Sequence, residues 1–352
     1  MRINTKVESY LKEHFGPDTR LMGMERLGEG MHGVAYLIKF RTGSEEKRLI
    51  MKTLFPSEFG HDHFSDRAQV LLLANADYNK MEKHIRAVDV VGEGPDRLIS
   101  LKEAREFYIF MNEARGTPYF KDLETILKRG RLKDVDIKRT QMLGRFLAQI
   151  HAETYRGENA GALYRRRIRE LIGHGECIMG IIDTYDQVEF TTDSELIEYA
   201  GKCLPWWGKI RDRNERLCRV HGDYHPGNIW FERDDFSLLD RSRGSWGEAA
   251  DDVSCLGVNY IHYAIKETGT FTGSFADLFR EFLNSYLEDT EDRGIFQVVQ
   301  PFFAFRILVI VNPRFYPDDR IETKRKLLDF GHSVLETEQF EIEQITNYIE
   351  GK

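Results

Sequence analysis

The chain has 352 residues, of which 41% are hydrophobic and 31% charged, enough for a folded protein with two sizeable cores. No run approaches the roughly 18 apolar residues of a membrane span, and the first residues lack the apolar segment of a signal peptide. The formal net charge of −8 disfavours nucleic acid as the main partner. We therefore expect a cytoplasmic globular protein that binds neither a membrane nor nucleic acid.

The first part of the chain shows mainly strand patterns. A short amphipathic helix is predicted over residues 4–15, and the alternating segments 34–40 and 48–54 predict two strands joined as a hairpin. A helix is predicted from 64 to 76. Two further strands are predicted at 85–91 and 106–111.

Beyond Gly116 the apolar spacing becomes helical. Residues 140–155 predict one helix and 161–215 a mostly helical stretch, while short strands are expected at 217–220 and 229–231. The rest, from about residue 251, again reads as helices. The sequence thus predicts an α+β fold with two lobes: a small β-rich N-lobe (1–112) and a larger, mostly helical C-lobe (113–352).

The four cysteines are widely spaced, and no two of them form a C-x-x-C pair. This spacing predicts reduced thiols rather than a zinc site or a disulfide framework, as is usual in the cytoplasm. The four are Cys177, Cys203, Cys218 and Cys255.

Three glycines near the N-terminus, Gly28, Gly30 and Gly33, match the spacing G-x-G-x-x-G. A dinucleotide-binding version of this motif would follow a strand and open a helix. Here the glycines lead into a predicted strand, which favours a glycine-rich hairpin whose backbone N–H groups face a phosphate. An ordinary hairpin turn is the alternative.

Lys52 lies on the next predicted strand among apolar neighbours. A lysine pointing into a dry site needs an anionic partner, which an ATP phosphate would supply; alternatively, Lys52 is an edge lysine whose amine reaches water. A carboxylate on the following helix would normally hold such a lysine. Asp66 is the leading candidate, Glu82 and Asp62 compete with it, and Gln69 could occupy the position instead.

The most informative segment runs from His221 to Phe231 and places Asp223 and Asn228 five positions apart on a tight turn. A carboxylate follows at Asp240, after a short apolar strand. Asp223 can accept a proton from an attacking hydroxyl, while the oxygens of Asn228 and Asp240 are ligands that Mg²⁺ prefers. The pattern therefore predicts phosphoryl transfer, with the alternative of a turn that has no chemical role.

The remaining polar residues near this segment are expected to support it. His221 is predicted to hydrogen-bond the backbone, and His225 with Pro226 to fix the turn; a zinc site on the two histidines would need further ligands. In the run Gly-Glu-Ala-Ala-Asp-Asp that begins at Gly247, one aspartate is predicted to cap a helix or to tie down the loop that holds Asp223.

These motifs resemble the aminoglycoside phosphotransferase and choline kinase superfamily, the small-molecule relatives of protein kinases. The likeness lies in His221-Gly222-Asp223-Tyr224-His225-Pro226-Gly227-Asn228, in Leu238-Leu239-Asp240, in the Gly-Glu-Ala-Ala-Asp-Asp run and in the helix segment Leu143–His151. It spans roughly residues 27–260 and is highly specific only over 221–257.

The resemblance implies a bilobed, protein-kinase-like fold that uses ATP and Mg²⁺. Asp223 would be the catalytic base, Asn228 and Asp240 the metal ligands, and Lys52 the phosphate-binding lysine. Adenine would lie against the backbone between Met111 and Glu113. The glycines Gly28, Gly30 and Gly33 would cover the phosphates.

One departure from the family pattern affects the expected substrate. Asp240 is followed by Arg241-Ser242-Arg243, where the family usually has an aromatic or acidic residue. These arginines could bind an anionic substrate or pair with nearby acids. The expected acceptor is the hydroxyl of a small molecule such as an amino sugar or amino alcohol, bound by the helical segments 161–215 and 262–345.

Two other functions fit the same residues. One is a nucleotide-binding regulatory module without catalysis, suggested by the uncertain partner of Lys52 and by the arginines after Asp240. The other is a kinase or nucleotidyltransferase that acts on protein, for which an open groove rather than a closed pocket would be expected.

Overall fold

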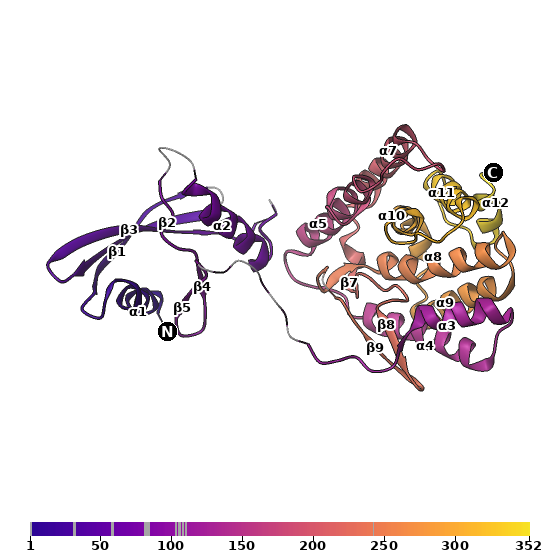
Figure 1. Cartoon of the computed structure of the whole chain (residues 1–352), viewed down its shortest axis with the longest axis horizontal. Helices are drawn as coiled ribbons and strands as arrows, with labels where there is room; N and C mark the ends of the chain where they lie inside the picture. The colour runs from indigo at the N-terminus through magenta and orange to yellow at the C-terminus, as the bar shows by residue number, and fades with distance from the viewer. Residues whose placement is uncertain are drawn as a thin grey trace. The chain divides into compact units, whose positions relative to one another are not determined.

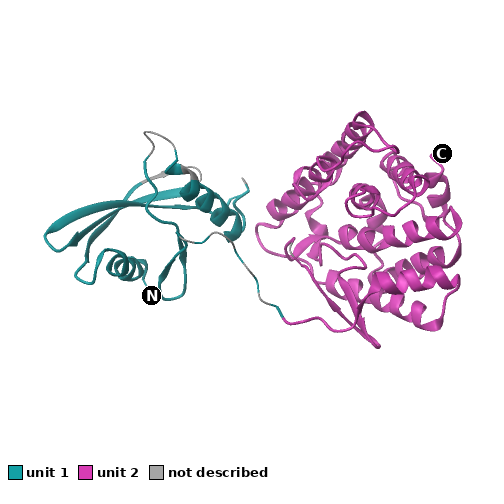
Figure 2. Cartoon of the chain, in the orientation of Figure 1, with its two compact units in different colours: residues 1–111 teal, residues 112–352 magenta. Residues whose placement is uncertain are grey.

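In a computed structural model the chain divides into two compact units, Met1–Met111 and Asn112–Lys352 (Figure 2). The structure describes residues 2–30, 33–57, 60–80, 85–102, 104, 107, 109, 111–241 and 243–352. Unit 1 combines small antiparallel sheets with helices, and unit 2 is mostly helical. The predicted α+β class is therefore confirmed. None of the helices in the described residues is long and apolar enough to cross a membrane.

Unit 1 is built on a three-stranded antiparallel sheet in the order β1-β2-β3, in which β2 is central. Its strands and helices are β1 (Arg20–Gly30), β2 (Gly33–Thr42), β3 (Glu45–Leu54), β4 (Val91–Glu93), β5 (Leu98–Ser100), α1 (Ile3–Phe15) and α2 (Phe64–Tyr78). The predicted helices at 4–15 and 64–76 and the hairpin of 34–40 with 48–54 are confirmed.

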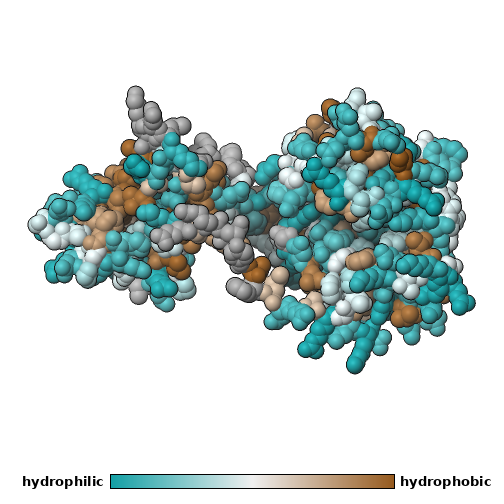
Figure 3. All heavy atoms as spheres, in the orientation of Figure 1, coloured by the Kyte–Doolittle hydropathy of each residue, from teal (hydrophilic) through white to brown (hydrophobic). Residues whose placement is uncertain are grey.

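The core of unit 1 is small. Val7 and Leu11 of α1 pack against Ile38 and Phe40 of β2, with Leu98 of β5 beside them. Large apolar side chains remain exposed in the same unit, and Figure 3 shows hydrophobic atoms on its visible surface. The exposed ones include Met22, Leu27, Ile50, Phe64 and Leu73.

The strand predicted at 85–91 is wrong except at its last residue, where β4 begins. The backbone of Ala87 donates to and accepts from the side-chain amide of Asn79, at 3.0 and 2.9 Å, so a side chain takes the place of a neighbouring strand. Without a sheet to cover it, Ile85 is 81% exposed. In the range 106–111, the described residues 107, 109 and 111 belong to no strand, and 106, 108 and 110 lie outside the described residues.

Unit 2 contains ten helices and five short strands in the residues described. The helices are α3 (Tyr119–Arg129), α4 (Asp134–His151), α5 (Ala160–Gly173), α6 (Ile178–Ile182), α7 (Asp193–Ile210), α8 (Ala249–Thr268), α9 (Gly273–Thr290), α10 (Gln300–Val311), α11 (Ile321–Leu335) and α12 (Ile345–Ile349), with 3-10 turns η1 (Asn214–Arg216), η2 (Arg293–Gln297) and η3 (Ile342–Gln344). The strands are β6 (Thr117–Pro118), β7 (Leu217–Arg219), β8 (Ile229–Glu232), β9 (Asp235–Leu238) and β10 (Trp246–Glu248).

Helix α8 is the centre of unit 2. Every residue from Ala249 to Ile265 is buried, because α9 and α10 pack on it from different sides (Figure 1). A helix buried on all faces is normally apolar all round. Because α8 also contains Asp251 and Asp252, these two carboxylates must find partners inside the protein.

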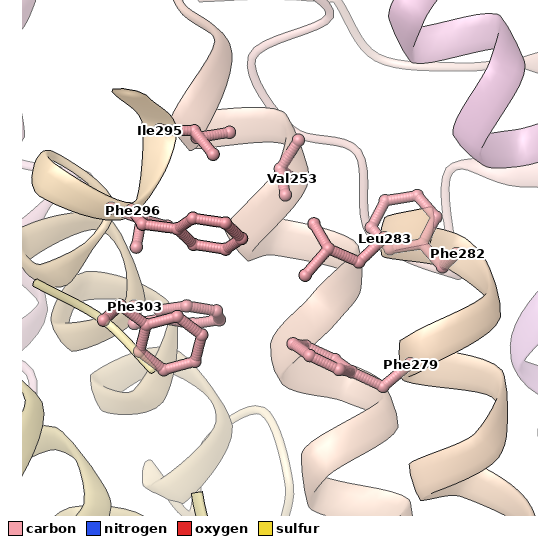
Figure 4. Close-up of a pocket in the computed structure, with 9 residues that line it drawn as sticks. Val253, Phe279, Phe282, Leu283, Ile295, Phe296 and Phe303 are labelled. Carbon is pink, nitrogen blue, oxygen red and sulfur yellow. The ribbon is translucent and has the colours of Figure 1, made fainter. Parts of the chain in front are cut away.

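The core beside α8 includes a pocket lined only by apolar side chains. Figure 4 shows Val253 of α8 facing side chains of α9, η2 and α10. Such a lining offers no donor to a phosphate and no acceptor to a hydroxyl, so this pocket belongs to the packing of the core. Its lining residues are Val253, Phe279, Phe282, Leu283, Ile295, Phe296, Val299, Phe303 and Phe340.

Two small sheets of unit 2 frame the segment from His221 to Asn228. Strand β7 pairs with β10, and β8 pairs with β9 and β6, so the segment forms the connection between two sheets. The strands predicted at 217–220 and 229–231 are confirmed as β7 and β8. Strand β10 leads directly into α8, which brings Asp251 and Asp252 to the segment.

Candidate active site

The backbone of the loop 221–228 is anchored by Asp252 at the start of α8. Its carboxylate accepts the N–H of His221 and the N–H of Gly222, both at 2.7 Å, and lies 3.2 Å from Nε2 of His151. Burial alone would raise the pKa of this carboxyl, but His151 and the two N–H donors outweigh it and hold the pKa below its usual value. The predicted role of one aspartate in tying down the loop is thereby confirmed for Asp252.

Gly222 allows the sharp bend of this loop. Its φ of +88° is a conformation that favours glycine, and a Cβ there would lie 3.3 Å from Cβ of Arg243. A side chain at position 222 would therefore strain the segment that presents Asp223.

Both carboxylate oxygens of Asp223 have polar neighbours. Oδ1 accepts a hydrogen bond from Nη1 of Arg306 at 2.5 Å, and Oδ2 accepts one from Nδ2 of Asn228 at 3.3 Å. Nε2 of His225 lies 3.7 Å from Oδ2. Burial would raise the pKa of Asp223, but Arg306, Arg243 and His225 outweigh it, so the pKa lies below the usual value and the group is ionised at neutral pH.

Asn228 and Asp240 lie at the same end of the β8–β9 hairpin. The backbone oxygen of Asn228 accepts the N–H of Leu239 at 2.9 Å, and Asp240 is the next residue. Asp240 has a φ of +53°, an uncommon conformation for a residue with a side chain. Its exposed carboxylate makes no hydrogen bond or ion pair with the residues that the structure describes. The structure thus brings Asp223, Asn228 and Asp240 to one loop and hairpin end.

The two histidines of the loop bind backbone rather than each other, as predicted. The N–H of Asp223 donates to Nδ1 of His221 at 3.2 Å, and the N–H of Gly227 donates to Nδ1 of His225 at 3.0 Å. Among the residues described, no group of three or more His, Cys, Asp or Glu side chains could hold a metal ion. The four cysteines are free and buried.

The arginines after Asp240 have different surroundings. Arg241 donates to the backbone oxygen of Val220 at 2.7 and 2.9 Å and so ties the end of the hairpin to the start of the loop. Arg243 lies over the ring of Phe305 and 3.9 Å from the exposed Glu176. Arg241 therefore holds backbone, whereas the positive charge of Arg243 lowers the pKa of Asp223.

Arg306 is the residue at this site that the sequence interpretation missed. It is the one charged residue of α10, whose sequence is QPFFAFRILVIV, and it is only 5% exposed. A single arginine in such an apolar helix is a usable signal, because a buried guanidinium requires a partner. The pattern alone does not say that the partner is Asp223, which is 83 positions away.

The predicted phosphate-binding residues of unit 1 lie on the β1–β2 hairpin and on β3. Gly28 pairs with Ala35, and Gly30 pairs with Gly33, across the hairpin whose residues 31 and 32 lie outside the described residues. A Cβ at Gly33 would lie 2.1 Å from the backbone oxygen of Thr53, so glycine is required there by the close approach of β3. The side chain of Glu29, between Gly28 and Gly30, lies outside what the structure describes.

Lys52 is exposed on β3, opposite Ala35. It makes no hydrogen bond or ion pair with any residue that the structure describes. Asp66 instead accepts the N–H of His63 at 2.8 Å, at the start of α2, and Glu82 lies outside the described residues. The structure therefore does not bring Lys52 and Asp66 together.

The predicted adenine-contacting residues flank the boundary between the units. Met111, the last residue of unit 1, is 71% exposed, and Glu113 in unit 2 is also exposed. Neither residue belongs to a helix or a strand. Their backbone groups are therefore not engaged in a sheet ladder.

Comparisons with known proteins identify part of unit 2. Residues 126–288 match the model of the phosphotransferase enzyme family, which confirms the resemblance stated from the sequence. The matched range includes Asp223, Asn228, Asp240 and Asp252, and excludes Lys52 and Arg306. No curated protein sequence matches the chain.

Several solved structures align with most of the chain at low identity. The amicoumacin kinase hAmiN, in complex with AMP-PNP, Ca²⁺ and Ami, shares 15% identity over 97% of this chain and 98% of its own, with a TM-score of 0.44. A thermostable mutant of the aminoglycoside phosphotransferase APH(4)-Ia, in ternary complex with AMP-PNP and hygromycin B, shares 14% identity over 94% of this chain and 98% of its own, with a TM-score of 0.38. The choline kinase of Cryptosporidium parvum shares 11% over 98% and 91%, with a TM-score of 0.33.

Proposed function

We propose that this protein is an ATP-dependent phosphotransferase that moves the γ-phosphoryl group of ATP to a hydroxyl of a small molecule. The observation that supports this most is the ionised carboxylate of Asp223 beside Asn228, with Asp240 at the same hairpin end. These residues lie in the part of the chain that matches the phosphotransferase family.

Asp223 acts in this proposal as the group that receives the proton of the acceptor hydroxyl. The acceptor oxygen forms a bond to the γ-phosphorus as the bond to the β,γ-bridging oxygen breaks and ADP leaves. Phosphoryl transfer through a loose transition state needs an oriented carboxylate more than a strong base. A carboxylate of lowered pKa, held from both sides, fits that requirement.

Asn228 and Asp240 fit a Mg²⁺ ion that is held mainly by phosphates and water. Mg²⁺ takes few ligands from protein in such sites, and the exposed Asp240 carboxylate has no partner among the described residues. The Nδ2 of Asn228 is turned to Asp223, which leaves its Oδ1 as the ligand atom. When bound, Mg²⁺ would neutralise charge on the phosphates.

The nucleotide contacts proposed for unit 1 rest on the glycine hairpin and Lys52. The exposed amine of Lys52 has no protein partner among the described residues. In this proposal it binds a phosphate of ATP. The backbone near Met111 and Glu113 is proposed to bind adenine. The proposed substrate-binding segments are 161–215 and 262–345. The protein is proposed to be cytoplasmic and to bind neither nucleic acid nor a membrane.

The test is ADP release from ATP against a panel of amino sugars, amino alcohols and sugars. One acceptor class should accelerate ADP release, and Asp223→Ala should remove the acceleration, at a cost of about 3 kcal/mol or more in the barrier. Asp289→Ala, at an exposed position of α9, is the matched control. Unchanged turnover in Asp223→Ala would contradict the role of Asp223.

A catalytically silent nucleotide-binding module is the second candidate. The finding that Lys52 has no carboxylate partner among the described residues favours it. This module would bind ATP and transfer phosphate to no acceptor. Its Asp223→Asn variant would bind ATP as tightly as the wild type. Transfer to a protein but to no small molecule would instead favour a protein kinase or nucleotidyltransferase.

A further inference from the structure

Arg306 stands out among the buried cations of unit 2 because it lies on a helix that otherwise carries no charge. Placing a guanidinium in the core costs several kcal/mol unless it is well paired. A leucine or a methionine at this position would avoid that cost. The presence of Arg306 therefore calls for an explanation beyond the packing of α10.

The guanidinium of Arg306 is fixed by three acceptors from two elements. Nη1 donates to Oδ1 of Asp223 at 2.5 Å, while Nη2 donates to the backbone oxygen of Gly222 at 3.0 Å and to Oδ1 of Asp251 at 2.6 Å. The ring of Phe305 covers one face of the group, 4.6 Å from its centre. Because both Nη1 and Nη2 are hydrogen-bonded, the guanidinium plane is held in a single orientation.

That orientation decides where the Asp223 carboxylate points. Arg306 holds Oδ1 from the side of α10, whereas Asn228 and His225 lie next to Oδ2 from within the loop. A carboxylate held at one oxygen by a rigid donor cannot rotate freely about its last torsion. Without Arg306, only weaker contacts would restrain the side chain. Asn228 donates to Oδ2 at 3.3 Å, and Sγ of Cys255 donates to Oδ1 at 4.0 Å.

We propose that Arg306 is a positioning residue that fixes the carboxylate of Asp223 for proton transfer, and that Asp251 is the anchor that fixes Arg306. The two adjacent aspartates of α8 then have separate tasks. Asp252 holds the backbone of the loop, and Asp251 holds its reacting side chain by way of Arg306. This inference rests on the proposed function, because it gives Asp223 the role of base.

Unit 2 contains a partly buried arginine, Arg216, that serves as a control. Arg216 forms hydrogen bonds of 2.8–2.9 Å with Glu248 and Asp292, so it bridges two carboxylates as Arg306 does. Neither partner belongs to the loop 221–228. Removing Arg216 should lower stability without disturbing the carboxylate of Asp223.

The experiment compares Arg306→Ala, Arg306→Lys and Arg216→Ala in the full chain. ADP release is measured without an added acceptor and with the acceptor found in the panel. Arg306→Ala should lower kcat about 100-fold with little change in KM for ATP, and millimolar guanidinium chloride should restore part of the loss. Arg306→Lys should lie between the alanine variant and the wild type, and Arg216→Ala should keep its kcat.

Two results would overturn the proposal: a rise in KM with unchanged kcat in Arg306→Ala, or an equal loss of kcat in Arg216→Ala. A crystal structure of Arg306→Ala supplies a readout that does not depend on turnover, and it should show the Asp223 carboxylate in a new or mixed orientation. An unmoved carboxylate would contradict positioning even if the wild type turned over no ATP. If only the proposed function is wrong, the wild type will transfer no phosphate, but the Asp223 carboxylate will still be displaced in the Arg306→Ala crystal structure.

Discussion

Asp223 in unit 2 is predicted to act on the acceptor hydroxyl and Lys52 in unit 1 on a phosphate of ATP, and the protein surrounds the two side chains differently. Asp223 is bonded to Arg306 and Asn228 on a loop whose backbone is tied to the buried Asp252. Lys52 is exposed and makes no polar contact with the described residues. The protein thus fixes its proposed base before any ligand arrives, whereas the lysine depends on the ligand for a partner.

The largest expected effect comes from Asp252→Asn, which weakens the fixed side of this comparison. Both carboxylate oxygens of Asp252 accept a backbone N–H, so in either orientation the NH₂ group of asparagine would face the N–H of His221 or of Gly222, and two donors would meet. The free energy of unfolding of unit 2 should fall by about 3 kcal/mol or more. Chemical denaturation checks this, with Asp289→Asn on the surface of α9 as the control. A loss as small as that of the control would mean that Asp252 does not hold the loop.

Gly33→Ala tests what the glycine hairpin needs before any nucleotide binds. A Cβ at Gly33 would overlap the backbone of Thr53, so β2 and β3 must separate, at a cost of about 1–3 kcal/mol in the stability of unit 1. Gly23→Ala is the matched control, because its Cβ would meet nothing within 4 Å. Hydrogen exchange of the β2 and β3 amides measures the difference. Equal protection in the two variants would contradict a packing role for Gly33.

Lys52→Met tests the exposed side of the comparison. Since Lys52 makes no polar contact with the described residues, stability should change by no more than about 0.5 kcal/mol. The KM for ATP should rise about tenfold, because a phosphate would lose its cation. Thermal unfolding and ATP titration of turnover measure the two quantities. A large loss of stability with an unchanged KM would show that Lys52 is a structural residue.

The smallest expected effect concerns pH. Unit 2 holds carboxyls whose pKa values are lowered despite burial, including Asp252 and Asp319, the latter with a pKa of about 2 because His262 and Lys266 outweigh burial. A lowered folded pKa gives stability that is present above the unfolded value near 4 and is lost as the pH falls toward 2. In unit 1, Glu25 and Glu46 have lowered pKa values at fully exposed ion pairs, which contribute little to stability.

Unit 2 should therefore lose protection before unit 1 as the pH is lowered from 5 to 2. Hydrogen exchange followed separately in the two units measures the order. Earlier loss in unit 1 would contradict the assignment of the acid-sensitive groups. Asp319→Asn should make the stability of unit 2 less dependent on pH in this range.

The sequence predicted the features that depend on local pattern. Alternating apolar residues located β2 and β3, and helical spacing located α4. Of these elements, β2 and α4 bury several side chains in the core. The turn that brings Asp223 and Asn228 together was also predictable, since the two residues are only five positions apart. The strand at 85–91 failed because alternation does not reveal that the Asn79 amide, eight positions away, pairs with the backbone of Ala87.

The sequence predicted that one aspartate of the run beginning at Gly247 would cap a helix or hold the loop, but it did not predict which groups that aspartate would contact, nor the role of Arg306. Arg306 and Asp223 are 83 positions apart, and His221 and Asp252 are 31 positions apart. Their meeting depends on how α8 and α10 pack, which no local pattern specifies. The roles of Asp223, Asn228 and Asp240 remain predictions, as does ATP binding by Lys52 and the glycines of unit 1.

The measurement that tests the central claim most directly is a single turnover of bound ATP by wild type and Asp223→Asn, with ATP affinity measured in parallel. The acceptor is the one that accelerates ADP release in the panel. We predict that both proteins bind ATP with similar affinity and that only the wild type transfers the γ-phosphoryl group at the accelerated rate. Equal transfer by the two proteins would contradict the assignment of Asp223 as the base.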